Sequence, residues 1–334
     1  MSHTSPASHH QFLSVSDLDA RGITETLTLA RGLKAGQVPG SDRTPLAGRA
    51  VALIFQKPSL RTRVSFEVGI ARLGATPVVL VGEEVGLGSR EVPRDVAHTL
   101  ERYVDAIVAR VFDHSLLEDL AAASRVPVLN ALSDAEHPCQ ALADLMALAE
   151  RWGGTEALAG RQLVYVGDGN NVAASLMLAG ASVGLHVRIA SPEGYEPDPL
   201  VVHHARHIAE ESGARIELVK DPVAAVTGAD AVYTDVWASM GQESEKDKRA
   251  NIFAPYQVNR ALFRLADRDA IFLHCLPAHR GDEVTADVID SPQSHVFQQA
   301  ENRLHAQKAI MLELMKGEFV KLPGLMELRE MAHV

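Results

Sequence analysis

The chain of 334 residues is 46% hydrophobic and 22% charged, which is the composition of a folded globular protein with enough apolar material for two domains. A disordered or low-complexity chain is excluded. Acidic residues outnumber Lys and Arg by 43 to 32, for a net charge of −11, which argues against a broad basic surface for nucleic acid or anionic lipid. Two cysteines are too few for a disulfide scaffold and fit a reducing compartment.

No segment of this sequence predicts a signal peptide or a membrane-spanning helix. Residues Met1–Gln11 are rich in Ser and His and lack the apolar core of a signal peptide. The longest apolar-rich stretch, Leu163–Val187, is interrupted by Asp168, two asparagines and several glycines, so it does not predict a membrane span. We therefore expect a soluble cytoplasmic enzyme that acts on small molecules, with no nucleic-acid or membrane partner.

In the first half of the chain, short apolar runs alternate with amphipathic stretches. This alternation is typical of strand–helix units that build a parallel sheet covered by helices. The expected strands are Val51–Phe55, Val78–Val81, Ala106–Val111 and Val126–Leu129, and the expected helices are Leu60–Leu73, Arg94–Tyr103 and Leu116–Ala123.

A long helix, Pro138–Trp152, is predicted next, and Gly153 and Gly154 mark a boundary after it. A second alternating series follows, with strands at Leu163–Val166, His186–Ala190, Arg215–Val219, Ala231–Thr234 and Ala270–His274, helices at Asn171–Gly184 and Leu200–Ser212, and a final helix at Ala300–Met315. The prediction is an α/β protein of two domains, each a parallel β-sheet flanked by helices, joined by a linking helix. The domains are residues 1–150, on which a C-terminal helix at about 300–320 packs back, and residues 151–299.

The segment Ser59-Leu60-Arg61-Thr62-Arg63 lies between a predicted strand and a predicted helix. A helix N-terminus offers free backbone N–H groups to an anion, and an arginine adds a fork that can bind phosphate through two hydrogen bonds. A serine N-cap followed by two exposed arginines is the alternative. The concentration of polar groups directly after a buried strand favours a phosphate site.

Two further segments are less specific when each is taken alone. His137 and Gln140, three residues apart at the start of the linking helix, can present a donor and an amide on one face, but taken alone they are better explained by a capping turn with Pro138. The turn Gly167-Asp168-Gly169-Asn170-Asn171 resembles a dinucleotide-binding turn, yet Val172 replaces the third glycine. An NAD-linked dehydrogenase is therefore a weak alternative, and an Asn-rich turn that hydrogen-bonds a small polar ligand fits better.

Three polar segments occur towards the C-terminus. Asp235 begins a D-x-x-x-S-M-G sequence after a predicted strand, where a carboxylate can bind an ammonium group. His274-Cys275-Leu276-Pro277 follows another strand. A zinc site from His274, Cys275 and His279 lacks the usual ligand spacing, so we expect no metal. Arg303 opens the final helix as another candidate anion ligand.

These segments, in this order, resemble the ornithine branch of the aspartate/ornithine carbamoyltransferase family. Residues 59–63 resemble its S-x-R-T-R loop and residues 137–140 its H-P-x-Q motif, while D-x-x-x-S-M-G and H-C-L-P separate ornithine enzymes from aspartate enzymes. The resemblance extends from about residue 46 to residue 315. It implies a transfer of the carbamoyl group of carbamoyl phosphate to the δ-amine of L-ornithine, giving L-citrulline and phosphate.

The resemblance also implies a role for each matching residue. The carbamoyl-phosphate-binding set, in the domain of residues 1–150 and at its junction with the second domain, is Ser59, Leu60, Arg61, Thr62, Arg110, His137, Gln140, Cys275, Leu276 and Arg303. The ornithine-binding set, in the domain of residues 151–299, is Asn171, Asp235, Ser239 and Met240. The residues expected to act in catalysis are Arg110, His137, Asp235 and Cys275.

No cofactor and no metal follow from the resemblance, which implies a homotrimer or a multiple of trimers. Gly86 stands where many relatives carry a side chain that reaches the neighbouring subunit's phosphate, so we expect Arg90, or else Ser89, to make that contact. A loop that only packs the interface is the equal alternative. Two alternatives stay open at this stage. One is a carbamoyltransferase that acts on putrescine or an acylated ornithine, and the other is a non-catalytic protein that binds ornithine or phosphate.

Overall fold

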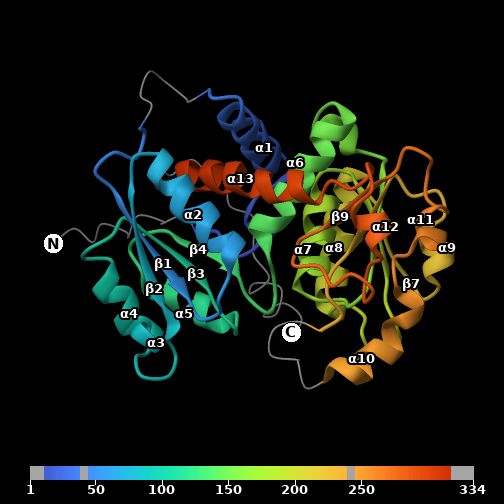
Figure 1. Ribbon diagram of the computed structural model, residues 1–334. Coiled ribbons are helices and arrows are strands. Elements are labelled where there is room, and N and C mark those ends of the chain that lie inside the picture. The colour runs from blue at the N-terminus through green and yellow to red at the C-terminus, as the bar shows by residue number, and fades with distance from the viewer. Residues whose placement is uncertain (1–10, 38–43, 239–244, 317–334) are drawn as a thin grey trace.

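The computed structural model describes residues 11–37, 44–238 and 245–316 of the chain. It contains two α/β domains, each with one parallel sheet, as the sequence predicted (Figure 1). None of the helices in the described ranges combines the length and the apolar character needed to cross a bilayer.

The first sheet has the strand order β2-β1-β3-β4. Its strands are β1 (Ala50–Phe55), β2 (Thr76–Val81), β3 (Ala106–Arg110) and β4 (Val128–Leu132), all parallel. Strand β1 is a continuous apolar run because helices cover both faces of such a sheet. The covering helices are α1 (Ala20–Lys34), α2 (Leu60–Arg72), α3 (Gly82–Val85), α4 (Pro93–Leu100) and α5 (Ser115–Ala123), and the short 3-10 helix η1 (Val15–Asp17) precedes them.

The predicted strand Val126–Leu129 was misplaced, because β4 begins at Val128 and continues to Leu132. Asn130 interrupts the apolar pattern although its side chain is fully buried in the strand. Its Nδ2 donates to the Leu13 carbonyl at 2.8 Å, a contact 117 residues away in sequence. A buried polar group of this kind cannot be placed from local periodicity alone.

The second sheet has the order β7-β6-β5-β8-β9. Its parallel strands are β5 (Gln162–Val166), β6 (His186–Ala190), β7 (Ile216–Val219), β8 (Ala231–Thr234) and β9 (Ile271–His274). The surrounding helices are α7 (Asn171–Ser182), α8 (Pro199–Ser212), α9 (Pro222–Val226), α10 (Lys246–Phe253), α11 (Arg260–Phe263) and α12 (Ala286–Ile289), with the 3-10 helices η2 (Glu156–Leu158) and η4 (Ala254–Tyr256).

Helices α6 (Pro138–Trp152) and α13 (Val296–Lys316) connect the two sheets (Figure 1). Gly153 ends α6 with a φ of 98°, a left-handed conformation that glycine adopts without strain. Helix α13 follows the second sheet but packs against α6, α1 and α2. One buried apolar cluster continues from the first domain through both helices into the second. The two domains therefore meet in a shared core, which holds the loops at their junction at fixed positions.

Candidate active site

In each sheet, the connections diverge at one point. From β1 the chain moves to β2 on one side, whereas from β3 it moves to β4 on the other. The same divergence occurs between β5 and β8. Such switch points leave a crevice at the carboxyl ends of the strands, where α/β proteins bind ligands. Ser59 and Arg110 lie at the first switch point, and Asn171 and Asp235 lie at the second.

Both switch points open into one cavity of about 610 Å³ between the domains. Most residues expected at the site line it: Ser59, Leu60, Arg61, Thr62, Arg110, His137, Asn171, Asp235, Cys275, Leu276 and Arg303. Gln140 is buried and does not line the cavity. Ser239 and Met240, the other two expected residues, lie outside the described residues.

Ser59 is the N-cap of α2, and its hydroxyl accepts a hydrogen bond from the Thr62 backbone N–H at 3.3 Å. The cap therefore serves the helix, as the alternative interpretation of the sequence required, but it also lines the cavity. The Leu60 side chain is 75% exposed, so any contribution of Leu60 to a ligand comes from its backbone. Backbone N–H groups at this helix N-terminus suit an anion.

Three guanidinium groups crowd the wall beside this helix. The buried Thr62 hydroxyl oxygen accepts from Arg303 Nη2 at 2.9 Å and from Arg110 Nη1 at 3.4 Å. Burial, followed by the charges of Arg303 and Arg61, lowers the pKa of Arg110 to about 10. Among the described residues, the Nε atoms of Arg110 and Arg303 have no hydrogen-bond partner. Like charges gathered in a buried wall are unfavourable until an anion compensates them.

His137 precedes α6 and is nearly fully buried. Its backbone N–H donates to Ser175 Oγ at 2.9 Å, which fixes the turn against α7. Burial, followed by the charges of Arg303, Arg110 and Arg61, lowers the pKa of His137 well below its usual value. The imidazole is therefore neutral at physiological pH and can donate one ring N–H without carrying a charge.

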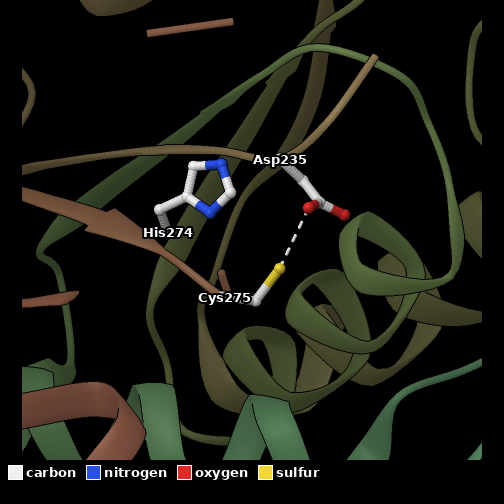
Figure 2. Close-up of side chains that lie close together, drawn as sticks. All are labelled: Asp235, His274 and Cys275. Carbon is white, nitrogen blue, oxygen red and sulfur yellow. Dashed lines mark hydrogen bonds between the residues drawn. The ribbon is translucent and has the colours of Figure 1, made fainter. Parts of the chain in front are cut away.

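Asp235 and Cys275 form a pair at the opposite wall. The Cys275 thiol donates to Asp235 Oδ1 at 3.0 Å, and Figure 2 shows the sulfur pointing at the carboxylate. Burial and the neighbouring Asp235 raise the pKa of Cys275 well above its usual value. The thiolate is the nucleophilic form of cysteine, so this thiol is poorly suited to covalent catalysis. It is a neutral donor that orients the carboxylate.

The second carboxylate oxygen, Asp235 Oδ2, accepts from Asn170 Nδ2 at 2.9 Å. Asn170 is the N-cap of α7, and its Oδ1 accepts from the backbone N–H groups of Val172 and Ala173. The Asn-rich turn was predicted to bind a small polar ligand, but the resemblance named only Asn171 of its two asparagines and missed the N-cap Asn170. Asn171 itself donates from Nδ2 to the Ser133 carbonyl at 2.6 Å, which joins the two domains.

Sequence reasoning also missed Lys57, a cavity-lining residue that is 9% exposed. Its ammonium lies 4.0 Å from the centre of the Phe112 ring, an arrangement that stabilises a buried cation. Lys57 directly precedes the predicted phosphate segment, but a single lysine after a strand carries no specific signal.

The H-C-L-P turn holds Leu276 at a φ of 58°, a left-handed conformation that is strained for leucine. The Leu276 backbone N–H donates to His274 Nδ1 at 2.8 Å, so the proton of the neutral ring lies on Nε2, which donates to Glu283 Oε1 at 3.2 Å. The Leu276–Pro277 peptide bond is cis. These contacts hold the turn in one conformation at the edge of the cavity.

The ligand atoms of Asp235, His274 and Cys275 lie within 4.8 Å of one another, as they would around a metal (Figure 2). The zinc set weighed from the sequence was different, because His279 groups instead with Asp282 and Glu283. Both ring nitrogens of His274 are engaged in hydrogen bonds, and the thiol donates to the carboxylate. A metal would have to break these bonds, so the donor set does not favour one.

Gly86 and Arg90 lie on the outer side of the phosphate segment. Gly86 has a φ of 62°, and a Cβ there would lie 2.6 Å from Arg90 Cβ, so any side chain at this position would be strained and would force Arg90 to shift. The Arg90 side chain is 62% exposed and lines a groove of about 910 Å³ together with Ser59 and Leu60. The loop therefore lies next to the phosphate segment of its own chain.

Comparison with known proteins agrees with this geometry. Residues 10–150 match the profile described as "Aspartate/ornithine carbamoyltransferase, carbamoyl-P binding domain", and residues 159–314 match "Aspartate/ornithine carbamoyltransferase, Asp/Orn binding domain". The chain is 52% identical over 304 residues to an ornithine carbamoyltransferase of Anoxybacillus flavithermus, with 91% of this chain and 96% of the relative covered.

Relatives from Pyrococcus furiosus are similar in sequence and in structure. An anabolic ornithine carbamoyltransferase is 54% identical over 305 residues, covering 91% of this chain and 96% of the relative. The solved structure of ornithine carbamoyltransferase from this organism superposes with a TM-score of 0.87 at 51% identity, covering 95% of this chain and 100% of that one. The chain belongs to the aspartate/ornithine carbamoyltransferase family.

Proposed function

We propose that this protein transfers the carbamoyl group of carbamoyl phosphate to the δ-amine of L-ornithine, giving L-citrulline and phosphate. One observation carries the proposal: a cluster of buried arginines and a carboxylate–thiol pair face each other across a single cavity of about 610 Å³. The first suits a phosphate dianion, and the second suits the ammonium group of an amino acid. Relatives named ornithine carbamoyltransferase, more than 50% identical over most of the chain, support the same reaction.

In this proposal the domain of residues 1–150, with the helix at about 300–320, holds carbamoyl phosphate. Ser59, the Leu60 backbone, Arg61 and Thr62 bind the phosphate. Arg303 closes the site from α13, because its guanidinium already bonds to the Thr62 hydroxyl. The three arginines repel one another without a ligand, so a dianion gains their full attraction.

Arg110 and His137 stabilise the charge that develops when the amine attacks. They donate to the carbonyl oxygen as it becomes an oxyanion, and fixed donors of this kind lower the barrier most. His137 suits this role because its pKa is depressed and its ring donates while neutral. Gln140 and the Leu276 carbonyl orient the carbamoyl NH₂ group as acceptors.

The domain of residues 151–299 holds ornithine. Asp235 binds the α-ammonium group and Asn171 the α-carboxylate, with Ser239 and Met240, which lie outside the described residues, completing the amino-acid site. Cys275 donates to Asp235 and so helps to position the substrate. The δ-nitrogen then forms a bond to the carbamoyl carbon as the bond to the phosphate oxygen breaks. The amine loses a proton to the departing phosphate or to solvent, so no enzyme nucleophile is required.

The remaining properties are proposed on the same basis. The protein acts in the cytoplasm, in the biosynthesis of arginine, without a cofactor or metal, and assembles as a homotrimer or a multiple of trimers. The relative from Pyrococcus furiosus that is named anabolic supports the biosynthetic role.

Citrulline formation from carbamoyl phosphate tests the proposal. Ornithine, putrescine, N-acetylornithine, lysine and aspartate are compared as acceptors, with phosphate release measured in parallel. We expect citrulline and phosphate in equal amounts with ornithine and at least about a hundredfold less product with the others. Putrescine, N-acetylornithine and aspartate each lack or alter a charged group that the site binds, and lysine places its amine one methylene further along. Preferential use of putrescine or N-acetylornithine would show that this amine, and not ornithine, is the acceptor substrate. Binding without any product would overturn the enzymatic assignment.

A further inference from the structure

A chain of buried hydrogen bonds connects the H-C-L-P turn to Gln140. The His274 backbone N–H donates to Gln299 Oε1 at 2.9 Å, and Gln299 Nε2 donates to Asp144 Oδ1 at 2.8 Å. Gln140 Nε2 donates to the same carboxylate oxygen at 2.8 Å. The three side chains are 0–1% exposed. Such a network has one favourable arrangement, because breaking any bond leaves a buried polar group unsatisfied.

The direction of every bond in this chain is fixed from one end. A backbone N–H can only donate, so Gln299 must turn its oxygen towards His274 and its NH₂ group towards Asp144. The oxygen of Asp144 that meets this NH₂ group must therefore accept. Gln140 bonds to the same oxygen, so it too must present its NH₂ group there. Its own oxygen is turned the other way.

The oxygen of Gln140 is consequently a buried acceptor with no hydrogen-bond partner among the described residues. Gln140 lies on the first turn of α6, three residues after His137 and on the same face of the helix, and His137 lines the cavity. A buried unpaired acceptor is costly unless a ligand supplies a donor.

We propose that Asp144 and Gln299 are positioning residues that hold the Gln140 amide with its oxygen towards the donor substrate, and thereby make the site specific for an acyl phosphate that carries an NH₂ group. This inference rests on the proposed function, in which Gln140 contacts the carbamoyl group. Carbamoyl phosphate supplies the missing donor. Acetyl phosphate has the same phosphate and carbonyl but a methyl group in place of NH₂, so it leaves the Gln140 oxygen unpaired.

This network of buried hydrogen bonds depends on an acceptor oxygen at position 144 and not on the charge of Asp144. Burial raises the pKa of Asp144 to about 6, while Gln299, Gln140, the Tyr233 hydroxyl and the charge of Arg303 act in the opposite direction. A proton on the other oxygen, Oδ2, leaves Oδ1 free to accept both bonds. An asparagine can also place its oxygen there, because Gln299 selects that orientation. Alanine removes the acceptor and leaves the Gln140 amide free to turn over.

The test compares the full-length wild type with Asp144→Ala, Asp144→Asn and Gln299→Met. The KM for carbamoyl phosphate and the competitive inhibition constant of acetyl phosphate are measured at saturating ornithine. The wild type is expected to bind acetyl phosphate at least about tenfold more weakly than carbamoyl phosphate, the equivalent of one lost hydrogen bond in a buried site. Asp144→Ala and Gln299→Met should bring the two constants to within about twofold, and Asp144→Asn should restore the wild-type ratio.

Leu145→Ala is the matched control. Leu145 is buried on the same helix, so the change opens a cavity there, but its apolar side chain makes none of these hydrogen bonds. It should lower the melting temperature and keep the wild-type ratio. A wild-type ratio in folded Asp144→Ala and Gln299→Met would overturn the inference, as would Asp144→Asn behaving like Asp144→Ala. If Asp144→Ala does not fold, Gln299→Met decides. A wild type that makes no citrulline would instead overturn the proposed function.

Discussion

The two walls of the cavity differ in how far their own polar groups satisfy one another. On the first wall, Arg61, Arg110 and Arg303 repel each other, and two of their Nε atoms lack partners among the described residues. On the second wall, Asp235 already accepts hydrogen bonds from Asn170 and Cys275. On the first wall, a bound phosphate removes the repulsion between the arginines. On the second wall, a ligand has to replace hydrogen bonds that Asp235 already accepts from the protein. Affinity is therefore concentrated on the first wall and selectivity on the second.

Arg61→Lys tests the first wall and should have the largest effect. Lysine keeps the charge but loses the planar fork, so a transition-state contact to phosphate is lost. We expect the turnover rate at saturating carbamoyl phosphate to fall about 10²- to 10³-fold. Arg63→Lys is the control, because Arg63 already pairs with Glu67 at 2.6 Å on the exposed side of the same loop. Equal, small losses in both variants would show that Arg61 is an ordinary surface arginine.

Glu136 joins the two domains behind these walls, and its charge should limit stability. Its Oε2 accepts from the Val15 backbone N–H at 3.2 Å and from Ser175 Oγ at 3.0 Å, beside the His137 turn. Burial raises its pKa to about 7. A raised pKa means that the folded state binds the proton more tightly, so this stabilisation is complete below about pH 4.5 and is lost as the pH rises through 7.

Glu136→Gln keeps the shape and removes this titration. At pH 8 it should raise the free energy of unfolding by roughly 3 kcal/mol relative to the wild type, and at pH 4.5 it should have little effect. Denaturant titrations at both pH values measure the difference, and the exposed Asp119→Asn serves as control. An equal effect of Glu136→Gln at both pH values would show that Glu136 is not buried as an acid.

Asp235→Asn tests the second wall. It removes the charge that faces the ammonium group but leaves a side chain of the same shape for Asn170 to contact. We expect kcat/KM for ornithine to fall about 10- to 100-fold, the cost of losing a charged hydrogen bond, while the affinity for carbamoyl phosphate stays within twofold. Cys275→Ser should cause a smaller loss, since a hydroxyl can still donate to Asp235. Parallel losses of both affinities, or a carbamoyl thioester trapped on Cys275, would contradict this division between the walls.

The pH dependence of ornithine use distinguishes titration of the substrate amine from titration of groups on the enzyme. An alkylamine resembles lysine, with a pKa of about 10.4, and attacks only when neutral. The pKa of His137 is depressed and that of Cys275 is raised, so neither group should titrate between pH 6 and 9. Steady-state rates should therefore give a kcat/KM for ornithine that rises up to tenfold per pH unit across this range. A flat profile would mean that attack by the amine does not limit the rate.

The sequence predicted the cavity-lining residues of both walls better than the groups that orient them. Residues of the arginine wall follow strand ends in short motifs, so Ser59, Arg61 and Arg110 could be placed from pattern and resemblance. The side chains that orient Asp235 and Gln140 could not be placed in this way. Asn170 reaches Asp235 across 65 residues and Gln299 reaches Asp144 across 155, contacts that depend on the packing of α13 and on the second sheet. Strand β4 was displaced for the same reason, because the partner of its buried asparagine lies far away in the chain.

The smallest expected effect concerns the outer face of the phosphate segment. Arg90 is exposed, and its guanidinium contacts the Val85 carbonyl and Glu91, each at 3.4 Å. We expect it to reach the phosphate of the adjoining subunit in the proposed trimer. An exposed charge contact is worth little, so Arg90→Ala should lower kcat/KM for carbamoyl phosphate only about two- to fivefold.

Mixed trimers show whether the contact crosses the interface. Subunits carrying Arg90→Ala are assembled with subunits inactivated by Arg61→Lys, which still carry Arg90. If the contact is made between subunits, activity per Arg90→Ala subunit rises towards the wild-type value as the inactivated partner is added. If Arg90 acts within its own subunit or only packs the interface, that activity stays constant at every composition.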